Sequence, residues 1–243
     1  MKKAVMIKLF LRFPFKSNQQ AMRHFSLLIL LLMPAFIFAQ DISQYPLSGS
    51  GKGNAKTLIF YISGDGGMNS FSQKIVDEMV QKNYSVVSLD SRKYFWAQKS
   101  PDQTAHDFSE IIQHYLKAYG KEEFSLVGYS FGADAVAFSI PRLPKELFKK
   151  LRSSVLLSPS SSTDFVVRVS DLIGFGSKEA KYKTLPELYK HTSTTYCIFG
   201  KEEDSEFYKL LKDRKNLNKT LIPGSHKYDN DIHKVVATIL TGI

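Results

Sequence analysis

A stretch in the middle of the chain, residues 124–134 (FSLVGYSFGAD), joins a strand pattern to a helix pattern through Gly-x-Ser-x-Gly, centred on Ser130. Leu126 and Val127 favour a strand, and residues 133–140 favour a helix. A serine between two glycines on a sharp strand-to-helix turn is typical of a nucleophile elbow, because the glycines relieve crowding in the turn. Ser130 is therefore the candidate nucleophile, although the five-residue pattern alone equally fits an ordinary turn.

The rest of the chain alternates apolar, β-branched runs with helical patterns. Strands are predicted at residues 57–63, 85–90, 124–129, 152–158, 194–199 and 218–222, and helices at 71–82, 102–119, 133–140, 203–213 and 229–240. Such alternation predicts a compact α/β fold with about six mostly parallel strands, flanked by helices on both faces. In such sheets the ligand binds at the carboxyl ends of the strands.

The N-terminal region reads as an export signal rather than as part of the fold. Arg23 and His24 precede an apolar run at residues 25–38, which is shorter than the roughly 20 residues of a membrane-spanning helix. We predict a signal peptide at 1–39, with 1–21 as a possible extended start before Met22, a polar leader at 40–56 and a single domain at 57–243. The protein is thus expected to be exported to the periplasm.

Charge and cysteine content exclude some functions. The chain has 33 basic and 23 acidic residues, and six of the basic ones lie in residues 1–39, which leaves 27 against 23, or a net charge of +4. Nucleic-acid binding therefore has little support, and only a mild attraction to anionic membrane surfaces remains. Cys197 is the sole cysteine, so no intrachain disulfide forms.

The candidate base is His226, in a loop after the last predicted strand and before the last helix. A serine nucleophile needs a base within hydrogen-bond reach. His233 is the nearest competitor but sits inside the final helical pattern, while His106, His114 and His191 fit helix or loop surfaces.

The candidate acid lies in residues 200–204 (GKEED), after the strand that ends at Phe199. Asp204 has the commoner residue type, whereas Glu203 has the usual spacing from Gly200, and either carboxylate can orient an imidazole. We rank Asp204 slightly ahead. The alternative is that these acids only favour the N-terminus of the next helix.

A glycine-rich turn, residues 63–67 (SGDGG), follows the first strand and predicts an oxyanion hole. Its donors would be the amides of Asp65 or Gly66 and of Phe131. A nucleotide-binding loop would need a Lys-Ser/Thr pair that is missing here. The order serine, acid, histidine is that of α/β-hydrolases, whose chemistry calls for neither a metal nor an organic cofactor.

Four segments, at residues 63–67, 90–96, 128–134 and 224–229, together resemble the VirJ/AcvB family of exported bacterial α/β-hydrolase-like proteins. The resemblance implies a serine hydrolase of the cell envelope. AcvB-type members cleave the aminoacyl ester of lysyl-phosphatidylglycerol, and VirJ-type members are linked to type IV secretion. This chain differs in having Met68 where the family usually has Trp, and in lacking the extra N-terminal half of AcvB-type members.

The segment 90–96 offers cations and aromatic rings beside the site. Arg92, Lys93, Tyr94 and Trp96 are candidate substrate-binding residues that could receive a phosphate head group and the start of an acyl chain. An alternative of similar weight is that the aromatic rings pack this loop onto the sheet.

Acidic residues near the nucleophile could meet a cationic aminoacyl group. Asp65 and Asp134 are the candidates, although Asp134 more readily caps or pairs within the elbow helix. The segment 160–191, where hydrolases insert a lid, is short and favours an open cleft for a membrane-borne substrate.

The sequence therefore predicts an exported serine esterase acting on an ester such as an aminoacyl phospholipid. A thioester or peptide as the scissile group stays open. The alternative from another class is an envelope binding or assembly factor, linked to type IV secretion components, that keeps the hydrolase shell.

Overall fold

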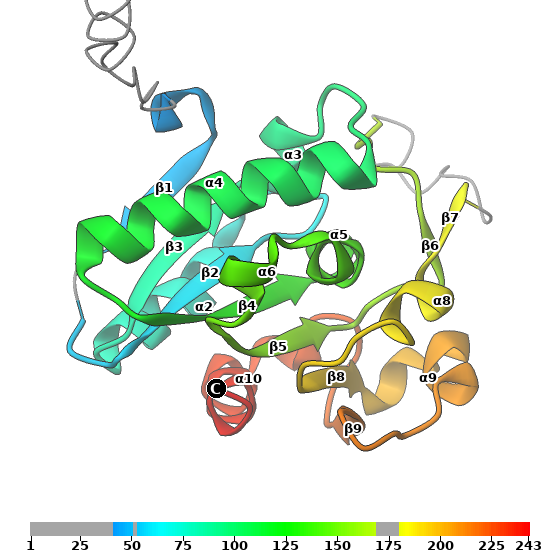
Figure 1. Cartoon of the computed structure of the whole chain (residues 1–243). Coiled ribbons are helices and arrows are strands. Elements are labelled where there is room, and N and C mark those ends of the chain that lie inside the picture. The colour runs from blue at the N-terminus through cyan, green and yellow to red at the C-terminus, as the bar shows by residue number, and fades with distance from the viewer. Residues whose placement is uncertain (1–40, 51–52, 169–179) are drawn as a thin grey trace, which may run out of the picture. The chain divides into compact units, whose positions relative to one another are not determined.

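The computed structural model describes residues 41–50, 53–168 and 180–243 (Figure 1). The predicted signal peptide and the possible extended start lie outside these residues. Within them, none of the helices combines the length and the apolar character needed to cross a membrane.

A seven-stranded sheet forms the centre of the domain (Figure 1). The strands are β1 (Leu47–Ser50), β2 (Thr57–Ile62), β3 (Ser85–Leu89), β4 (Glu123–Tyr129), β5 (Leu151–Leu157), β8 (Thr195–Gly200) and β9 (Leu217–Ile222), in the order β1-β3-β2-β4-β5-β8-β9. All neighbours pair in parallel except β1, which runs antiparallel to β3. The six predicted strands are all present.

The sheet begins earlier than the sequence predicts, because β1 lies inside the segment expected to be a polar leader. Leu47 pairs with Leu89 at one end of β1, and Ser50 pairs with Val86 at the other. A four-residue edge strand of sequence LSGS has too little apolar alternation to be recognised locally.

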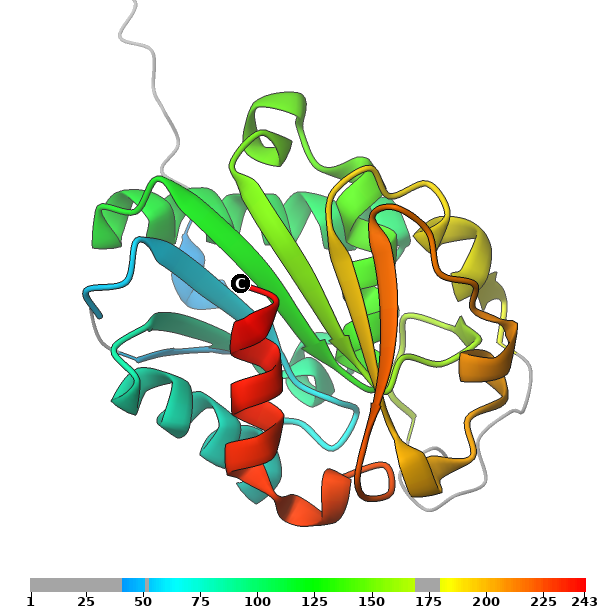
Figure 2. The ribbon, with the colours of Figure 1, turned by 90° about the horizontal axis from the view of Figure 1, so that it is seen from below.

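Helices cover both faces of the sheet. They are α2 (Ser70–Gln81), α3 (Ser91–Tyr94), α4 (Pro101–Tyr119), α5 (Phe131–Ser139), α6 (Lys145–Phe148), α8 (Thr184–Leu188), α9 (Glu206–Leu210) and α10 (Ile232–Thr241). Helices α2 and α10 lie on one face, in front of the sheet in Figure 2, whereas α4 and α5 lie on the other.

Strand β2 shows why both faces are covered. Leu58, Phe60 and Ile62 point into the core beneath α4 and α5, and Ile59 and Tyr61 point into the core beneath α2 and α10. All five are fully buried. A strand apolar on both faces needs a layer on each side, as the sequence predicts for a central parallel strand.

Two predicted helices are shorter than expected. The predicted helix 203–213 is a 3₁₀ turn η3 (Lys201–Glu203) followed by α9, because Asp204 between them is left-handed, with φ 48°. The predicted helix 229–240 starts at Ile232, after the 3₁₀ turn η4 (Tyr228–Asn230). Both departures put irregular backbone at the carboxyl ends of β8 and β9.

The insertion 160–191 is built, in its described part, from a small hairpin-like pair, β6 (Ser162–Thr163) and β7 (Tyr182–Lys183), and from α8. Residues 169–179 lie outside the described residues. The ring of Phe165 is fully buried and packs edge-on against Phe95 and Phe138. The aromatic contacts hold this insertion over the helix that starts at the elbow.

His191 is buried, so its expected place on a surface is wrong. It is 5% exposed, and its Nε2 lies 2.8 Å from the Ala137 carbonyl oxygen while Nδ1 lies 3.0 Å from Thr195 Oγ1. Since a carbonyl only accepts, Nε2 carries the proton and Nδ1 accepts from Thr195. Burial lowers the pKa of His191 to about 4, outweighing the hydrogen bond to Ala137 that favours the charged form.

This buried imidazole is expected to make the fold acid-sensitive. The unfolded chain protonates His191 below about pH 6.5, whereas the folded chain keeps it neutral down to about pH 4. The free energy of unfolding should therefore fall as the pH drops through this window, by up to about 3 kcal/mol. Urea unfolding measured against pH checks this: His191→Asn should flatten the slope, while replacing the exposed His114 with Asn should leave it. Equal slopes in the two variants would count against this assignment.

Candidate active site

Ser130 stands on a strained turn between β4 and α5. Its φ of 52° and ψ of −121° lie in a region that residues other than glycine rarely adopt. The flanking glycines permit the turn: a Cβ on Gly128 would lie 2.5 Å from the Gly132 carbonyl oxygen, and one on Gly132 would lie 2.3 Å from the Ile62 carbonyl oxygen. The predicted elbow geometry is present at these residues.

The predicted base reaches Ser130 from the loop after β9. His226 Nε2 lies 2.9 Å from Ser130 Oγ, across 96 residues of sequence. Tyr129 holds this loop in place. Its hydroxyl donates to the His226 carbonyl oxygen over 3.3 Å, and its ring centre lies 5.4 Å from that of the imidazole. The nearest competitor, His233 of α10, instead contacts Glu78 of α2.

The acid beside His226 is Glu203. Its Oε1 lies 2.7 Å from His226 Nδ1. The higher ranking of Asp204 is corrected by the geometry: the Asp204 side chain is 84% exposed and pairs with Lys209 over 2.9 Å. The η3 turn aims Glu203 inward, and the left-handed backbone of Asp204 turns the next carboxylate out to solvent.

The Glu203 carboxylate is stabilised as an anion. Burial raises its pKa, but hydrogen bonds from His226 and Ser158 outweigh burial, so that the pKa lies below its usual value.

The loop after β8 and the loop after β9 are joined to each other through Glu202. Its side chain accepts a hydrogen bond from the Gly224 amide, and its own amide donates to the Gly224 carbonyl oxygen. Sequence reasoning missed this role of Glu202, which only the pairing of distant loops makes visible.

Two of the three predicted oxyanion donors have free amides. The Phe131 amide is at the first position of α5, where a helix leaves its N–H groups unpaired. Among the described residues the amides of Asp65 and Phe131 have no acceptor. The Gly66 amide differs, since it donates to Asp65 Oδ1 over 2.8 Å. Asp65 and Phe131 are therefore the two candidates whose amides remain available as donors.

A pocket of about 190 Å³ opens beside Ser130 and Phe131. Three carboxylates line it, from Asp65, Asp134 and Asp164, and Arg168 is paired with Asp164 over 3.1 Å. The pocket is smaller than the 300–1,000 Å³ usual for drug-sized ligands. Its small volume fits a small polar group better than a long acyl chain, and Asp65 supplies most of its negative charge, because Asp164 is paired with Arg168 and burial favours the neutral form of Asp134.

Asp134 lies at the buried end of that pocket. It is 2% exposed, and burial raises its pKa well above the usual value although two hydrogen bonds from Ser160 lower it. Ser160 donates its amide to Asp134 Oδ1 over 2.8 Å and its hydroxyl to Asp134 Oδ2, and the same hydroxyl lies 2.9 Å from the Ser162 carbonyl oxygen. The expectation that Asp134 caps or pairs within the elbow helix is therefore wrong, because its partner, Ser160, lies after β5 and outside α5.

The candidate substrate-binding residues of segment 90–96 divide into two groups. Arg92, Lys93 and Trp96 are exposed and line a second pocket, of about 630 Å³, together with Gly66 and Gly67 of the oxyanion loop. Trp96 is 59% exposed. This pocket borders the loop that carries Asp65.

Tyr94 does not belong to the second pocket, and its predicted contact with substrate is wrong. The side chain is buried beneath α4, and its hydroxyl donates to Asp107. Phe95 is also buried, with its ring 4.8 Å from that of Phe131. Packing of the loop therefore takes up two of the three aromatic rings, and only Trp96 faces solvent.

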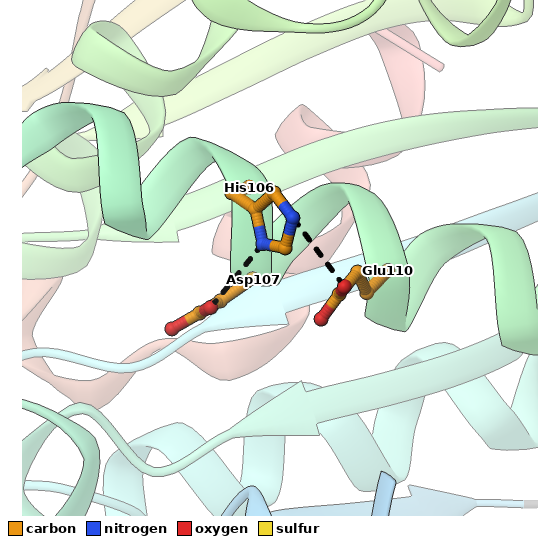
Figure 3. A group of neighbouring side chains, drawn as sticks. All are labelled: His106, Asp107 and Glu110. Atoms are coloured by element: carbon orange, nitrogen blue, oxygen red, sulfur yellow. Dashed lines mark ion pairs between the residues drawn. The ribbon is translucent and has the colours of Figure 1, made fainter. Parts of the chain in front are cut away.

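His106, Asp107 and Glu110 form a group with metal-ligand chemistry on α4 (Figure 3). Hydrogen bonds to tyrosine hydroxyls explain why the two carboxylates lie close together. The Tyr45 hydroxyl donates to Glu110 over 2.8 Å and lies 3.3 Å from Asp107. Tyr94 donates to the other Asp107 oxygen. The group therefore anchors the segment before β1 to α4, and we assign it no ligand.

Comparisons with known proteins agree with this fold. The model of the family "Bacterial virulence protein (VirJ)" matches residues 56–243. No curated protein matches the sequence. Solved structures with similar folds include a Pyrococcus furiosus esterase, Pf2001, with a TM-score of 0.57 and 13% identity over 84% of this chain and 93% of that one.

Two further solved structures are similar at the same level. They are Est1E of Butyrivibrio proteoclasticus with ferulic acid bound (TM-score 0.56, 13% identity, 82% of this chain and 94% of that one) and a proline iminopeptidase of Mycobacterium smegmatis (0.56, 12%, 80% and 92%). These likenesses confirm the predicted α/β-hydrolase fold. With the family model matching most of its length, the chain belongs to the VirJ family of bacterial virulence proteins.

Proposed function

We propose that the protein is an exported serine hydrolase that cleaves a carboxylic ester bearing an amine on its acyl part, such as an aminoacyl phospholipid. The observation that carries the proposal is the continuous contact from Ser130 Oγ to His226 Nε2 at 2.9 Å and from His226 Nδ1 to Glu203 at 2.7 Å. Esterases and a thioesterase domain among the solved structures of the same fold support the reaction class. The signal-peptide pattern of residues 1–39 supports a place in the periplasm.

In the proposed reaction, each residue of this contact series has a role in ester cleavage. Ser130 Oγ attacks the carbonyl carbon while His226 Nε2 takes the hydroxyl proton, and Glu203 stabilises the imidazolium that results. The amides of Asp65 and Phe131 stabilise the oxyanion. His226 then returns the proton to the departing alcohol oxygen, leaving an acyl group on Ser130. Water, deprotonated by the same imidazole, releases this group in the second half of the reaction.

The two pockets beside the oxyanion loop support the substrate class. An ammonium group entering the smaller pocket would meet the Asp65 carboxylate, and beside it Asp164, which is paired with Arg168. A phosphate on the leaving alcohol would meet Arg92 and Lys93 in the larger pocket, and Trp96 offers an apolar surface beside it. An aminoacyl phospholipid carries both groups, one on each side of the scissile ester.

The release of lysine from lysyl-phosphatidylglycerol in mixed micelles tests this proposal, with a soluble lysine ester as the comparison substrate. We expect turnover of both by the unsubstituted protein, and in the double variant Arg92→Ala, Lys93→Ala a fall in the ratio of lipid to soluble turnover of about tenfold. Lys234→Ala, an exposed substitution on α10, should leave the ratio unchanged. Turnover of simple uncharged esters but not of either lysine ester would refute the substrate class while keeping the hydrolase.

A further inference from the structure

The Glu203 carboxylate has partners on both of its oxygens. Oε1 faces His226 Nδ1, whereas Oε2 accepts from the Ser158 hydroxyl over 2.8 Å and from the Gly200 amide over 3.3 Å. Ser158 is the first residue after β5. One oxygen thus contacts the imidazole, and the other is held by groups that do not touch the candidate substrate pocket.

Ser158 is itself tightly fixed. It is 2% exposed, and its amide donates to the Ile198 carbonyl oxygen over 2.7 Å. Its φ of 46° is left-handed, a conformation that disfavours residues other than glycine by about 1 kcal/mol or more. A buried serine held in this backbone state presents its hydroxyl in one direction, towards the carboxylate.

Tyr228 completes the contact from the far side. Its hydroxyl lies 2.7 Å from Ser158 Oγ and 3.0 Å from the Ile198 carbonyl oxygen, and its side chain is 1% exposed. Two hydroxyl protons serve three contacts. The ionised carboxylate is the strongest acceptor and takes the Ser158 proton. The Tyr228 proton is then shared between Ile198 and Ser158 Oγ, which leaves Ser158 as a donor to Glu203.

The charge state of these neighbours is constant through the reaction. The titratable groups that face Glu203 are His226, Tyr129 and Tyr228. Burial raises the pKa of both tyrosines, so both stay neutral at physiological pH. Of the groups around the carboxylate, only His226 changes its charge when Ser130 gives up its proton.

We propose that Ser158 and Tyr228 are positioning residues for the reaction at Ser130, which act by holding the Glu203 carboxylate ionised and aimed at His226 Nδ1. Neither residue contacts the serine or the pocket beside it. The inference rests on the proposed function, and it adds a hydroxyl pair that no local sequence pattern indicates.

Ser158→Ala tests the proposal, with Ser154→Ala as its matched control. Ser154 lies on β5, four residues before Ser158, is fully buried and shares a hydrogen bond of 2.9 Å with Thr195 Oγ1, away from the site. In Ser158→Ala we expect kcat for a soluble ester to fall about tenfold with KM changed less than about twofold, the size expected when a carboxylate loses one donor. Ser154→Ala should lower the melting temperature and leave kcat unchanged.

A second readout does not depend on turnover. The Glu203 carboxyl titration, followed by ¹³C NMR, should move to higher pH by about half a unit or more in Ser158→Ala, because fewer hydrogen bonds stabilise the anion. Tyr228→Phe keeps the Ser158 hydroxyl but removes the group that orients it. A smaller change in the same direction is expected there, about threefold in kcat.

Unchanged kcat and an unchanged Glu203 titration in folded Ser158→Ala would overturn the inference. If that variant does not fold, Tyr228→Phe decides by the same two measurements. An unsubstituted protein that turns over no ester would instead contradict the proposed function. The Glu203 titration would even then establish whether Ser158 stabilises the carboxylate.

Discussion

Replacing Ser130 with alanine is expected to abolish ester hydrolysis, with kcat lower by about 10⁴-fold or more. The reason is that Ser130 Oγ is the only hydroxyl that His226 Nε2 contacts among the described residues. Alanine keeps the strained elbow backbone and removes one hydroxyl at the rim of a pocket, so the free energy of unfolding should change by less than about 1 kcal/mol. Ester turnover and urea unfolding of the purified variant measure the two effects.

The control for this variant is Ser225→Ala, an exposed serine next to His226 in the sequence. It should keep both activity and stability. Residual turnover in Ser130→Ala close to that of the unsubstituted protein would show that another group is the nucleophile.

Replacing each of the two neighbouring acids, Glu203 and Asp204, by its amide should give sharply different results. Glu203→Gln keeps the size of the side chain but removes the charge that stabilises the imidazolium, so kcat should fall by about 10²–10⁴-fold. Asp204→Asn should change kcat by less than about twofold, because that carboxylate faces solvent and Lys209. Steady-state kinetics on the two single variants is the measurement.

A loss of activity in Asp204→Asn with normal activity in Glu203→Gln would mean that the acid loop rearranges when substrate binds. Equal losses in both variants would instead indicate that the loop acts as a unit. Either result contradicts the assignment of Glu203 alone.

The fold and the central part of the site were accessible from the sequence because their signals are local. Alternating strand and helix patterns predict the sheet, and the glycines around Ser130 predict its turn. His226 follows from its place after the last strand. The choice between Glu203 and Asp204 could not be made from the sequence, because the two carboxylates are adjacent in the chain. Which of them faces His226 depends on the η3 turn and on the left-handed backbone at Asp204.

Contacts between distant segments account for what the sequence could not supply. Ser158 and Tyr228 are 70 residues apart and meet only because β5 and the loop after β9 end at the same edge of the sheet. Tyr94 is adjacent in sequence to exposed cations, yet it lies in the core, where its hydroxyl donates to Asp107 and its ring packs against Phe108. Residue type alone does not distinguish a tyrosine that packs a loop from one that contacts a ligand.

The most direct test of an activated Ser130 is labelling of the chain from Gln40 onward with a fluorophosphonate probe, which reacts with activated serines. The unsubstituted protein is expected to take up the label, and both Ser130→Ala and His226→Ala are expected to lose it, since the serine needs the imidazole to give up its proton. A folded, monodisperse sample that takes up no label would contradict an activated Ser130 and favour an envelope assembly factor that keeps the hydrolase shell.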